Sequence, residues 1–301
     1  MAQGFSVRKY AMAFTPEIPD NSKINFKVTR AARDEIKKQF PNYMLHGNNL
    51  YSCASHSDPL MFNAEYDGQD YTIEIKFTKV VNEDPLEWSA FQSIVFKNIL
   101  GRMSFERDGR NMFNPLKAVN IQGIDIWPGF YSSMQNLASG TYLQIDLANK
   151  VIRTDKLISM LEDLKNKNKS TEQINEELSG MSVVTTYGTK KHTYRIESID
   201  FMRSPVCTFK KGKPGEEVEI SFKDYYQQTY GVTINDLNQP LVISKNRKTG
   251  MEVALVPELC QMTGLTDQQR ANFNLMRDLA GVLHKDGQKR INETKALMDE
   301  I

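Results

Sequence analysis

Large hydrophobic residues near the start of the chain follow two simple periods. In residues 10–14 and 71–77 they occupy every second position, which places them on one face of a strand. In residues 28–40 they occupy every fourth position, which predicts a helix with one apolar face. The positions are Tyr10, Met12 and Phe14, then Val28, Ala32, Ile36 and Phe40, then Tyr71, Ile73, Ile75 and Phe77. Together they predict an α+β unit over residues 1–82.

The next segment contains one predicted helix and one predicted strand. Asp84-Pro85 is typical of a helix start, and the apolar stripe that follows is expected to end at Gly101, because a residue without Cβ can terminate a helix. Residues 102–140 mix polar residues with short apolar groups, and residues 141–147 alternate as a strand. We interpret residues 83–152 as a structured linker.

A further domain is predicted over residues 153–262. It begins with a helical stripe at 157–164 and a capping box at 170–173, in which side chains satisfy the free backbone groups of a helix start. Short β-rich segments then surround one helix at 221–230. Those segments are 181–187, 193–199, 217–220 and 241–244. Many short strands with one small helix predict a partly open barrel that carries an insertion.

The last segment, residues 263–301, is predicted to be helical. Thr266–Gln269 repeats the capping-box pattern and opens one long amphipathic helix. Its apolar face is formed by Phe273, Met276, Ala280 and Leu283, and a further stripe by Ile291, Leu297 and Ile301. Packing of these stripes on the preceding domains is the simplest explanation for them.

Composition excludes several classes of protein. The 301 residues include 38 Lys plus Arg and 37 Asp plus Glu, so the net charge is +1 and no overall basic field indicates a nucleic-acid partner. Neither an apolar run of membrane-spanning length nor a signal-peptide pattern is visible, which predicts a cytoplasmic or nuclear location without a membrane partner. Three cysteines, widely spaced, support neither a disulfide framework nor a zinc site.

Positive charge is concentrated locally in residues 187–250, which hold eleven Lys or Arg against seven Asp or Glu. A basic cluster alone is most often solvated surface, but aromatic residues change the balance, because single strands stack their bases on aromatic rings while cations follow the phosphates. In the predicted helix Tyr226 and Tyr230 lie on one side, whereas Tyr225 points about 100° away. The three tyrosines are therefore not expected to share one surface by helix geometry alone, and one of them is expected to lie in the core.

Several short motifs follow one another in order across nearly the whole chain. They are Phe14-Thr15-Pro16-Glu17-Ile18, Ile126-Trp127-Pro128-Gly129-Phe130, Thr193-Tyr194-Arg195-Ile196, Thr208-Phe209-Lys210-Lys211, Asp224-Tyr225-Tyr226 with Tyr230, Val256-Pro257-Glu258-Leu259-Cys260 and Thr263-Gly264-Leu265-Thr266-Asp267. In this order they resemble the Argonaute family, specifically its PIWI clade. The resemblance implies an N domain at 1–82, a first linker at 83–152, a PAZ domain at 153–262 and second-linker helices at 263–301. The PAZ domain is expected to be an OB-like, partly open β-barrel with a small α/β insertion, within an α+β chain.

The resemblance also implies what this chain does not do. Family members of usual length continue into MID and PIWI domains, and the sequence is expected to be an N-terminal portion without them. Because the guide 5′-phosphate pocket and the slicer residues of the family lie there, no enzymatic activity, catalytic residue, metal or cofactor is expected. The four histidines show no metal-ligand spacing, and no Walker-type phosphate loop occurs. Implied partners are a single-stranded small guide RNA (piRNA), the MID and PIWI domains, and silencing proteins.

For the PAZ domain, the resemblance implies a pocket that anchors the 3′ end of the guide RNA for gene silencing. Phe209 would stack under the terminal base, and the hydroxyls of Tyr194, Tyr225 and Tyr230 would contact the last phosphates. Tyr226 is then expected to be a structural residue. The other expected contacts are Lys191, His192, Arg195 and Lys210. An apolar lining for a 2′-O-methylated terminal sugar is expected from Met251, Ala254, Leu255 and Val256.

Two other interpretations stay open at the level of sequence. Aromatic residues of a small β-rich domain often fill its core, in which case they bind nothing. The same fold can also serve as a protein-interaction or scaffold fragment that does not bind RNA. Titration with a labelled single-stranded RNA distinguishes these interpretations from guide binding.

Overall fold

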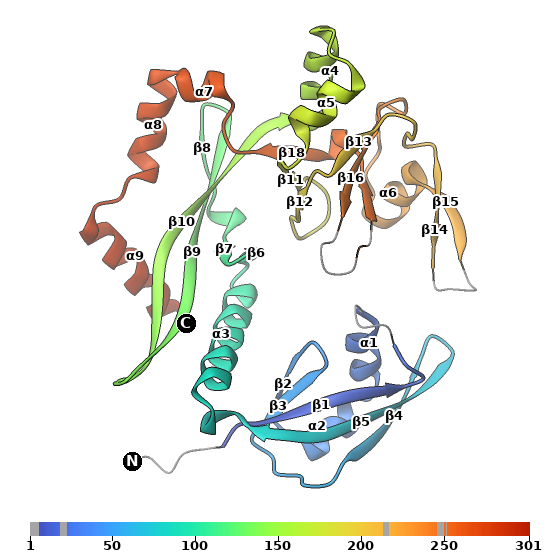
Figure 1. Ribbon diagram of the computed structural model, residues 1–301, viewed down its shortest axis with the longest axis vertical. Helices are drawn as coiled ribbons and strands as arrows, with labels where there is room; N and C mark the ends of the chain where they lie inside the picture. Colours follow the sequence, from blue (N-terminus) through green and yellow to red (C-terminus); the bar gives the residue numbers. More distant parts are fainter. Residues whose placement is uncertain (1–5, 19–22, 213–216, 246–249, 251) are drawn as a thin grey trace. The chain divides into compact units, whose positions relative to one another are not determined.

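The computed structural model describes residues 6–18, 23–212, 217–245, 250 and 252–301 (Figure 1). The chain divides into two compact units: Met1–Asn98 with Ser133–Gln144, and Ile99–Ser132 with Ile145–Ile301. Helices and strands are mixed in both units, which confirms the predicted α+β class.

The first unit is an antiparallel five-stranded sheet in the order β2-β3-β1-β5-β4, with two helices packed on it. Its elements are β1 (Arg8–Thr15), α1 (Lys23–Ala31), α2 (Arg33–Gln39), β2 (Tyr43–His46), β3 (Asn49–Ser52), β4 (Leu60–Tyr66), β5 (Gln69–Val80) and the short helix η1 (Val81–Glu83). Both predicted strands are confirmed. The predicted helix breaks at Ala32, yet Val28, Ala32, Ile36 and Phe40 are all buried, because the break preserves their common face.

Helix α3 (Pro85–Arg102) follows and begins at the predicted residue. Its Trp88 and Phe91 pack in a small cluster with Tyr51 and Val81. The expected end at Gly101 was wrong, because the helix continues to Arg102 and the left-handed residue beyond it is Ser104, with φ of 64°.

The second unit opens with strands that the sequence pattern did not indicate. They are β6 (Glu106–Asp108), β7 (Asn111–Phe113), β8 (Val119–Ile121) and β9 (Ile124–Leu137), with η2 (Pro115–Lys117) between β7 and β8; β10 (Gly140–Lys156) extends the predicted strand. The motif around Gly129 interrupts the alternation of β9. A Cβ at Gly129 would lie 2.2 Å from the carbonyl oxygen of Met112, so glycine is required where β7 approaches β9. The predicted boundary at 152 falls inside β10.

The same sheet continues into the barrel-like part of the chain. Its order is β12-β11-β18-β10-β9-β7-β6, and β13-β16-β17 form a second sheet. The elements are α4 (Leu157–Asn166), α5 (Thr171–Leu178), β11 (Ser182–Thr185), β12 (Thr193–Arg195), β13 (Ser198–Asp200), β16 (Leu241–Lys245), β17 (Glu252–Leu255), η3 (Pro257–Leu259) and β18 (Cys260–Thr263). One core unites both sheets with α4 and α5. The segment 193–199 was predicted as one strand but forms two, since β12 and β13 pair in different sheets.

An insertion lies between β13 and β16 in the sequence. It consists of the hairpin β14 (Thr208–Lys211) and β15 (Val218–Ser221) followed by α6 (Phe222–Tyr230), which lies beside the hairpin (Figure 1). The predicted small α/β insertion in a barrel-like domain is therefore confirmed.

The tail consists of three helices where one long helix was predicted. They are α7 (Asp267–Ala271), α8 (Phe273–Leu283) and α9 (Gly287–Glu300). Asn272 and Asp286 divide them, because each accepts a hydrogen bond from the backbone of the helix that it caps. The predicted apolar face was wrong at Phe273, which is 77% exposed; the buried residues of α8 are Leu275 and Leu279.

Candidate nucleic-acid interface

The candidate site is built on the insertion, where α6 and β14 bring aromatic rings together. Ser221 caps α6 by accepting a hydrogen bond from the Asp224 amide, and Gly231 ends the helix in the left-handed conformation at φ of 66°. The Phe209 ring, on β14, lies 4.7 Å from the Phe222 ring and 5.4 Å from the Tyr225 ring. The hairpin and the helix therefore share one aromatic cluster.

The three tyrosines of α6 differ in burial. Tyr226 is 2% exposed and its hydroxyl donates to the Tyr187 hydroxyl at 3.3 Å, so it belongs to the core, as predicted. Tyr225 is half-buried, and Tyr230 is 39% exposed. Tyr225 and Tyr230 lie 5.9 Å apart, and each also contacts the Tyr226 ring. The three rings contact one another because long side chains near the end of a helix converge, but they do not share one surface, since Tyr226 is buried.

Two neighbouring lysines of β14 lie on opposite faces of the hairpin. Lys211 shares the face of Phe209, and its Nζ lies 5.1 Å from the centroid of the Tyr225 ring. Lys210 lies on the other face, where it forms an ion pair of 3.0 Å with Glu217. The cation beside the aromatic cluster is thus Lys211, and not the Lys210 of the predicted site.

The hairpin β11–β12 carries the other predicted contacts. Tyr194 is half-buried against the barrel core, and its pKa is raised by desolvation first and then by its neighbour Tyr230. The ring of His192 lies 6.5 Å from the Tyr194 ring. Lys191 donates from Nζ to the Thr186 carbonyl at 2.7 Å. Arg195 reaches over Gly180, where an added Cβ would lie 3.0 Å from its Nη2, so it points away from Tyr194 along the alternating strand.

The predicted sugar lining is divided between two cores. Ala254 and Val256 pack in the cluster of the insertion, together with Phe209 and Tyr225. Leu255 packs in the barrel core with an exposure of 1%, because successive residues of β17 face opposite sides. Met251 lies outside the described residues.

Burial raises the pKa of several phenols in and beside the cluster. Desolvation, then hydrogen bonding with Tyr230, raises the pKa of Tyr225 to about 12. Desolvation likewise raises the pKa of Tyr194, Tyr226 and Tyr187. A neutral phenol can donate a hydrogen bond to a phosphate oxygen, whereas a phenolate would repel it. The described part of the cluster can therefore offer aromatic faces, neutral donors and the Lys211 cation.

Among the described residues, Phe222, Tyr187 and Lys211 belong to the cluster but were absent from the predicted set. Tyr187 lies 4.8 Å from the Tyr230 ring and 4.9 Å from the Tyr226 ring, and Lys211 contacts Tyr225. The period-two alternation of β14 could have selected Lys211 over Lys210. For Tyr187, which follows β11, the sequence offers no comparable signal.

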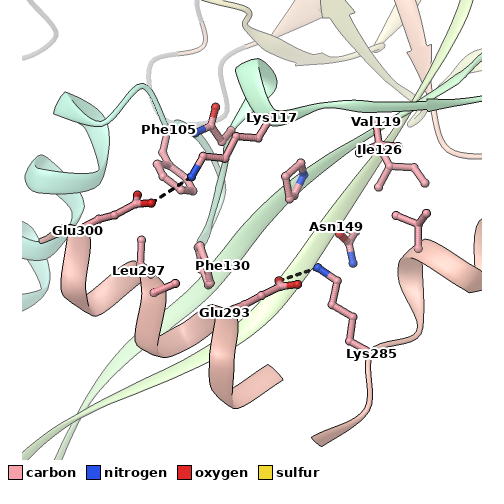
Figure 2. A pocket seen from close by; sticks show the side chains of 14 residues that line it. Phe105, Lys117, Val119, Ile126, Phe130, Asn149, Lys285, Glu293, Leu297 and Glu300 are labelled. Atoms are coloured by element: carbon pink, nitrogen blue, oxygen red, sulfur yellow. Dashed lines mark hydrogen bonds and ion pairs between the residues drawn. The ribbon is translucent and has the colours of Figure 1, made fainter. Parts of the chain in front are cut away.

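A separate apolar cavity of about 310 Å³ lies under α9 (Figure 2). Phe105, Pro128, Phe130 and Leu297 contribute to its walls, and the ion pairs Lys117–Glu300 and Lys285–Glu293 lie at its edge. None of the predicted RNA contacts lines it. Its charged groups are paired with one another and do not indicate a ligand.

The described part of the chain contains neither a metal site nor a membrane-spanning helix. Among the described residues, no group of three His, Cys, Asp or Glu side chains could hold a metal ion. No helix in that part is long and apolar enough to cross a membrane.

Comparison with known proteins places this geometry in a family. The PAZ domain family matches residues 155–285. Piwi-like protein Ago3 of Bombyx mori is 32% identical over 289 residues, which cover 91% of this chain and 30% of that protein. Piwi-like protein 1 of Gallus gallus is 33% identical, with 79% of this chain and 28% of that protein covered. The chain thus spans about a third of the length of these relatives.

The fold agrees with a solved structure of the same group. The crystal structure of Drosophila Piwi matches with a TM-score of 0.58 and 23% identity, over 99% of this chain and 38% of that one. This likeness supports the fold, and the sequence matches support the clade. The chain contains a PAZ domain and belongs to the PIWI clade of the Argonaute family.

Proposed function

We propose that this chain binds a single-stranded small guide RNA and that its PAZ domain anchors the 3′ end of that RNA. The observation that carries the proposal is the chain of ring contacts from Phe209 through Tyr225 to Tyr230, which runs from half-buried to exposed and has Lys211 at its side. The PAZ match and the PIWI-clade relatives support RNA as the ligand.

Each group has a distinct part in the proposed binding. Phe209 offers a π face to the terminal base, and stacking of this kind contributes about 1–3 kcal/mol per base. Tyr194, Tyr225 and Tyr230 donate hydrogen bonds to the last phosphates, and Lys211 neutralises charge there. Ala254 would line the site of a 2′-O-methyl group, with Val256 behind it.

We further propose that the chain acts in RNA-mediated gene silencing as a guide-binding part and does not itself cleave RNA. In this proposal the chain works in the cytoplasm or nucleus. RNA cleavage, the functions of the MID and PIWI domains and the silencing partner proteins are those of the wider family. Incubation of the purified chain, a guide and a matched target with Mg²⁺ or Mn²⁺ tests the first point. Guide-directed products would contradict it.

The binding proposal is tested by fluorescence anisotropy with a short labelled RNA that has a free 3′ hydroxyl, or a 3′ end blocked by a bulky phosphate or a hairpin. We expect the free end to bind more tightly. Phe209→Ala should weaken binding of the free end by about 1–3 kcal/mol. Phe273→Ala is the matched control, because Phe273 is 77% exposed on α8, outside the cluster, and should leave affinity unchanged.

The scaffold alternative makes the opposite prediction. If the rings only fill the core, free and blocked ends bind equally and Phe209→Ala lowers stability without a specific effect on RNA. That result would favour a protein-interaction role for the same fold.

A further inference from the structure

Lys150, on β10, is a buried charge between the first-linker strands and the barrel-like part. Only 9% of it is exposed, and a lysine is rarely so buried unless it is paired. Its Nζ lies 2.7 Å from Asp108 Oδ2 and donates a hydrogen bond to the Thr193 hydroxyl. It also lies 5.8 Å from the ring centroids of Phe113 and Trp127. The ammonium group is thus held between a carboxylate, a hydroxyl and two π faces.

A second contact joins the same two parts of the chain as the contacts of Lys150. Glu106 Oε1 accepts a hydrogen bond from the backbone amide of Lys191 at 2.8 Å. Glu106 and Asp108 both lie on β6, whereas Lys191 and Thr193 belong to the segment Lys191–Tyr194, an arm that leads into β12. Since β6 and β12 stand at the two ends of the strand order, the two contacts link opposite ends of one sheet.

The linked arm carries part of the candidate RNA site. Lys191 and Thr193 flank His192, and Thr193 directly precedes Tyr194. Strand β12 has only three residues and pairs with β11 along one edge, so its position depends on what holds the other side. A small displacement of β12 would move the Tyr194 hydroxyl relative to Tyr230 and Tyr225.

We propose that Lys150, through Asp108 and Thr193, is a positioning residue that sets the Lys191–Tyr194 arm of the RNA 3′-end site. This inference rests on the proposed function and extends it to a residue that does not touch RNA. The first-linker strands then take part in end recognition, because they supply both carboxylates of the bridge.

Lys150→Met tests the bridge, because methionine keeps most of the length and loses the charge and the donors. We expect faster amide hydrogen exchange at residues 191–194 and a dissociation constant for free-ended RNA about tenfold higher, because a displaced Tyr194 would lose its proposed charged hydrogen bond to a phosphate. The ratio of the affinities for free-ended and blocked RNA should fall by a similar factor. Lys165→Met is the matched control, since Lys165 also lies over a ring, that of Phe201, but outside the site.

A second pair of variants keeps the test decisive if Lys150→Met does not fold. Thr193→Val removes the hydroxyl and keeps the shape, whereas Thr193→Ser restores it, so the first should reproduce the exchange and end-preference effects and the second should not. Folded Lys150→Met or Thr193→Val protein with wild-type exchange and wild-type end preference would overturn the inference. If the wild type itself shows no end preference, the proposed function fails, and the exchange data alone decide whether Lys150 orders the arm.

Discussion

Two aromatic clusters in this chain use the same ring geometry in different surroundings. In the first unit the Tyr10 ring lies 5.0 Å from Phe40 and 5.8 Å from Phe77, both edge to face. In the second unit Tyr225 lies 5.4 Å from Phe209 and 5.9 Å from Tyr230, also edge to face. Ring contacts alone therefore do not separate a core from a binding surface.

Exposure and the hydroxyl partners do separate them. Tyr10 is 1% exposed, and its hydroxyl donates to the Ala54 carbonyl at 2.6 Å, which fixes the phenol inside the unit. Tyr230 is 39% exposed, and Tyr225 and Tyr230 hydrogen-bond with each other at the edge of the cluster. The first cluster stabilises the fold, whereas the second has faces and hydroxyls left for a ligand.

The largest expected effect tests the core side of this comparison. Phe40→Ala removes a ring with 0% exposure that packs on Tyr10, so it should lower the free energy of unfolding by about 3–5 kcal/mol. RNA affinity of the protein that remains folded should not change. Urea unfolding followed by tyrosine fluorescence measures the first effect, and anisotropy measures the second. A loss of RNA affinity in folded Phe40→Ala would break the comparison.

How well the sequence predicts these two regions depends on how regularly their hydrophobic residues repeat. In the first unit the helical face from Val28 to Phe40 and strands β1 and β5 were predictable, because each has a clean hydrophobic period, whereas β2, β3 and β4 were not predicted. Strand β9 was not predictable, because Gly129, which is needed for the close approach of β7, interrupts its alternation of hydrophobic residues. The tail divides at Asn272 and Asp286, whose capping bonds compete with helix continuation.

The sequence selected part of the aromatic cluster and missed Tyr187, Phe222 and Lys211. The resemblance selected Phe209, Tyr225 and Tyr230, which do meet. Alternation along β14 separates Lys210 from the cluster, and alternation along β17 sends Leu255 into the other core. Lys150 could not be selected from sequence, because its partners, Asp108 and Thr193, lie 42 and 43 positions away.

An intermediate effect sharpens the comparison within the exposed cluster. Lys211→Gln should raise the RNA dissociation constant by up to about fivefold, because it removes the cation beside the half-buried Tyr225 ring that is proposed to pair with a phosphate, and an exposed ion pair contributes about 0.2–1 kcal/mol. Lys210→Gln is the matched control one residue away, paired with Glu217, and should change affinity less. Anisotropy at two salt concentrations distinguishes the mechanisms: end recognition gives a shallow salt slope. Equal effects of both lysines, with a steep slope, would indicate a generic basic surface.

The smallest expected effect is on stability at alkaline pH and concerns Tyr225. Its pKa is raised from 10.0 to about 12, by desolvation first and then by hydrogen bonding with Tyr230. In the unfolded chain this phenol ionises near pH 10, whereas in the folded chain it stays protonated until about pH 12. The folded state therefore holds the proton more tightly. Its contribution to stability is complete below pH 10 and is lost as the pH rises from about 10 to about 12.

Tyr225→Phe removes that titration, so the decline of stability across this window should be shallower than in the wild type. Urea midpoints at several pH values between 9 and about 11.5 measure it, on either side of the ordinary tyrosine pKa. Tyr142→Phe is the control, because Tyr142 is 48% exposed and lies in the other unit. Parallel pH profiles for the wild type and Tyr225→Phe would mean that Tyr225 ionises as freely in the folded protein as in the unfolded chain. Its hydroxyl would then be solvated rather than held against Tyr230, and the exposed cluster would be looser than the ring distances indicate.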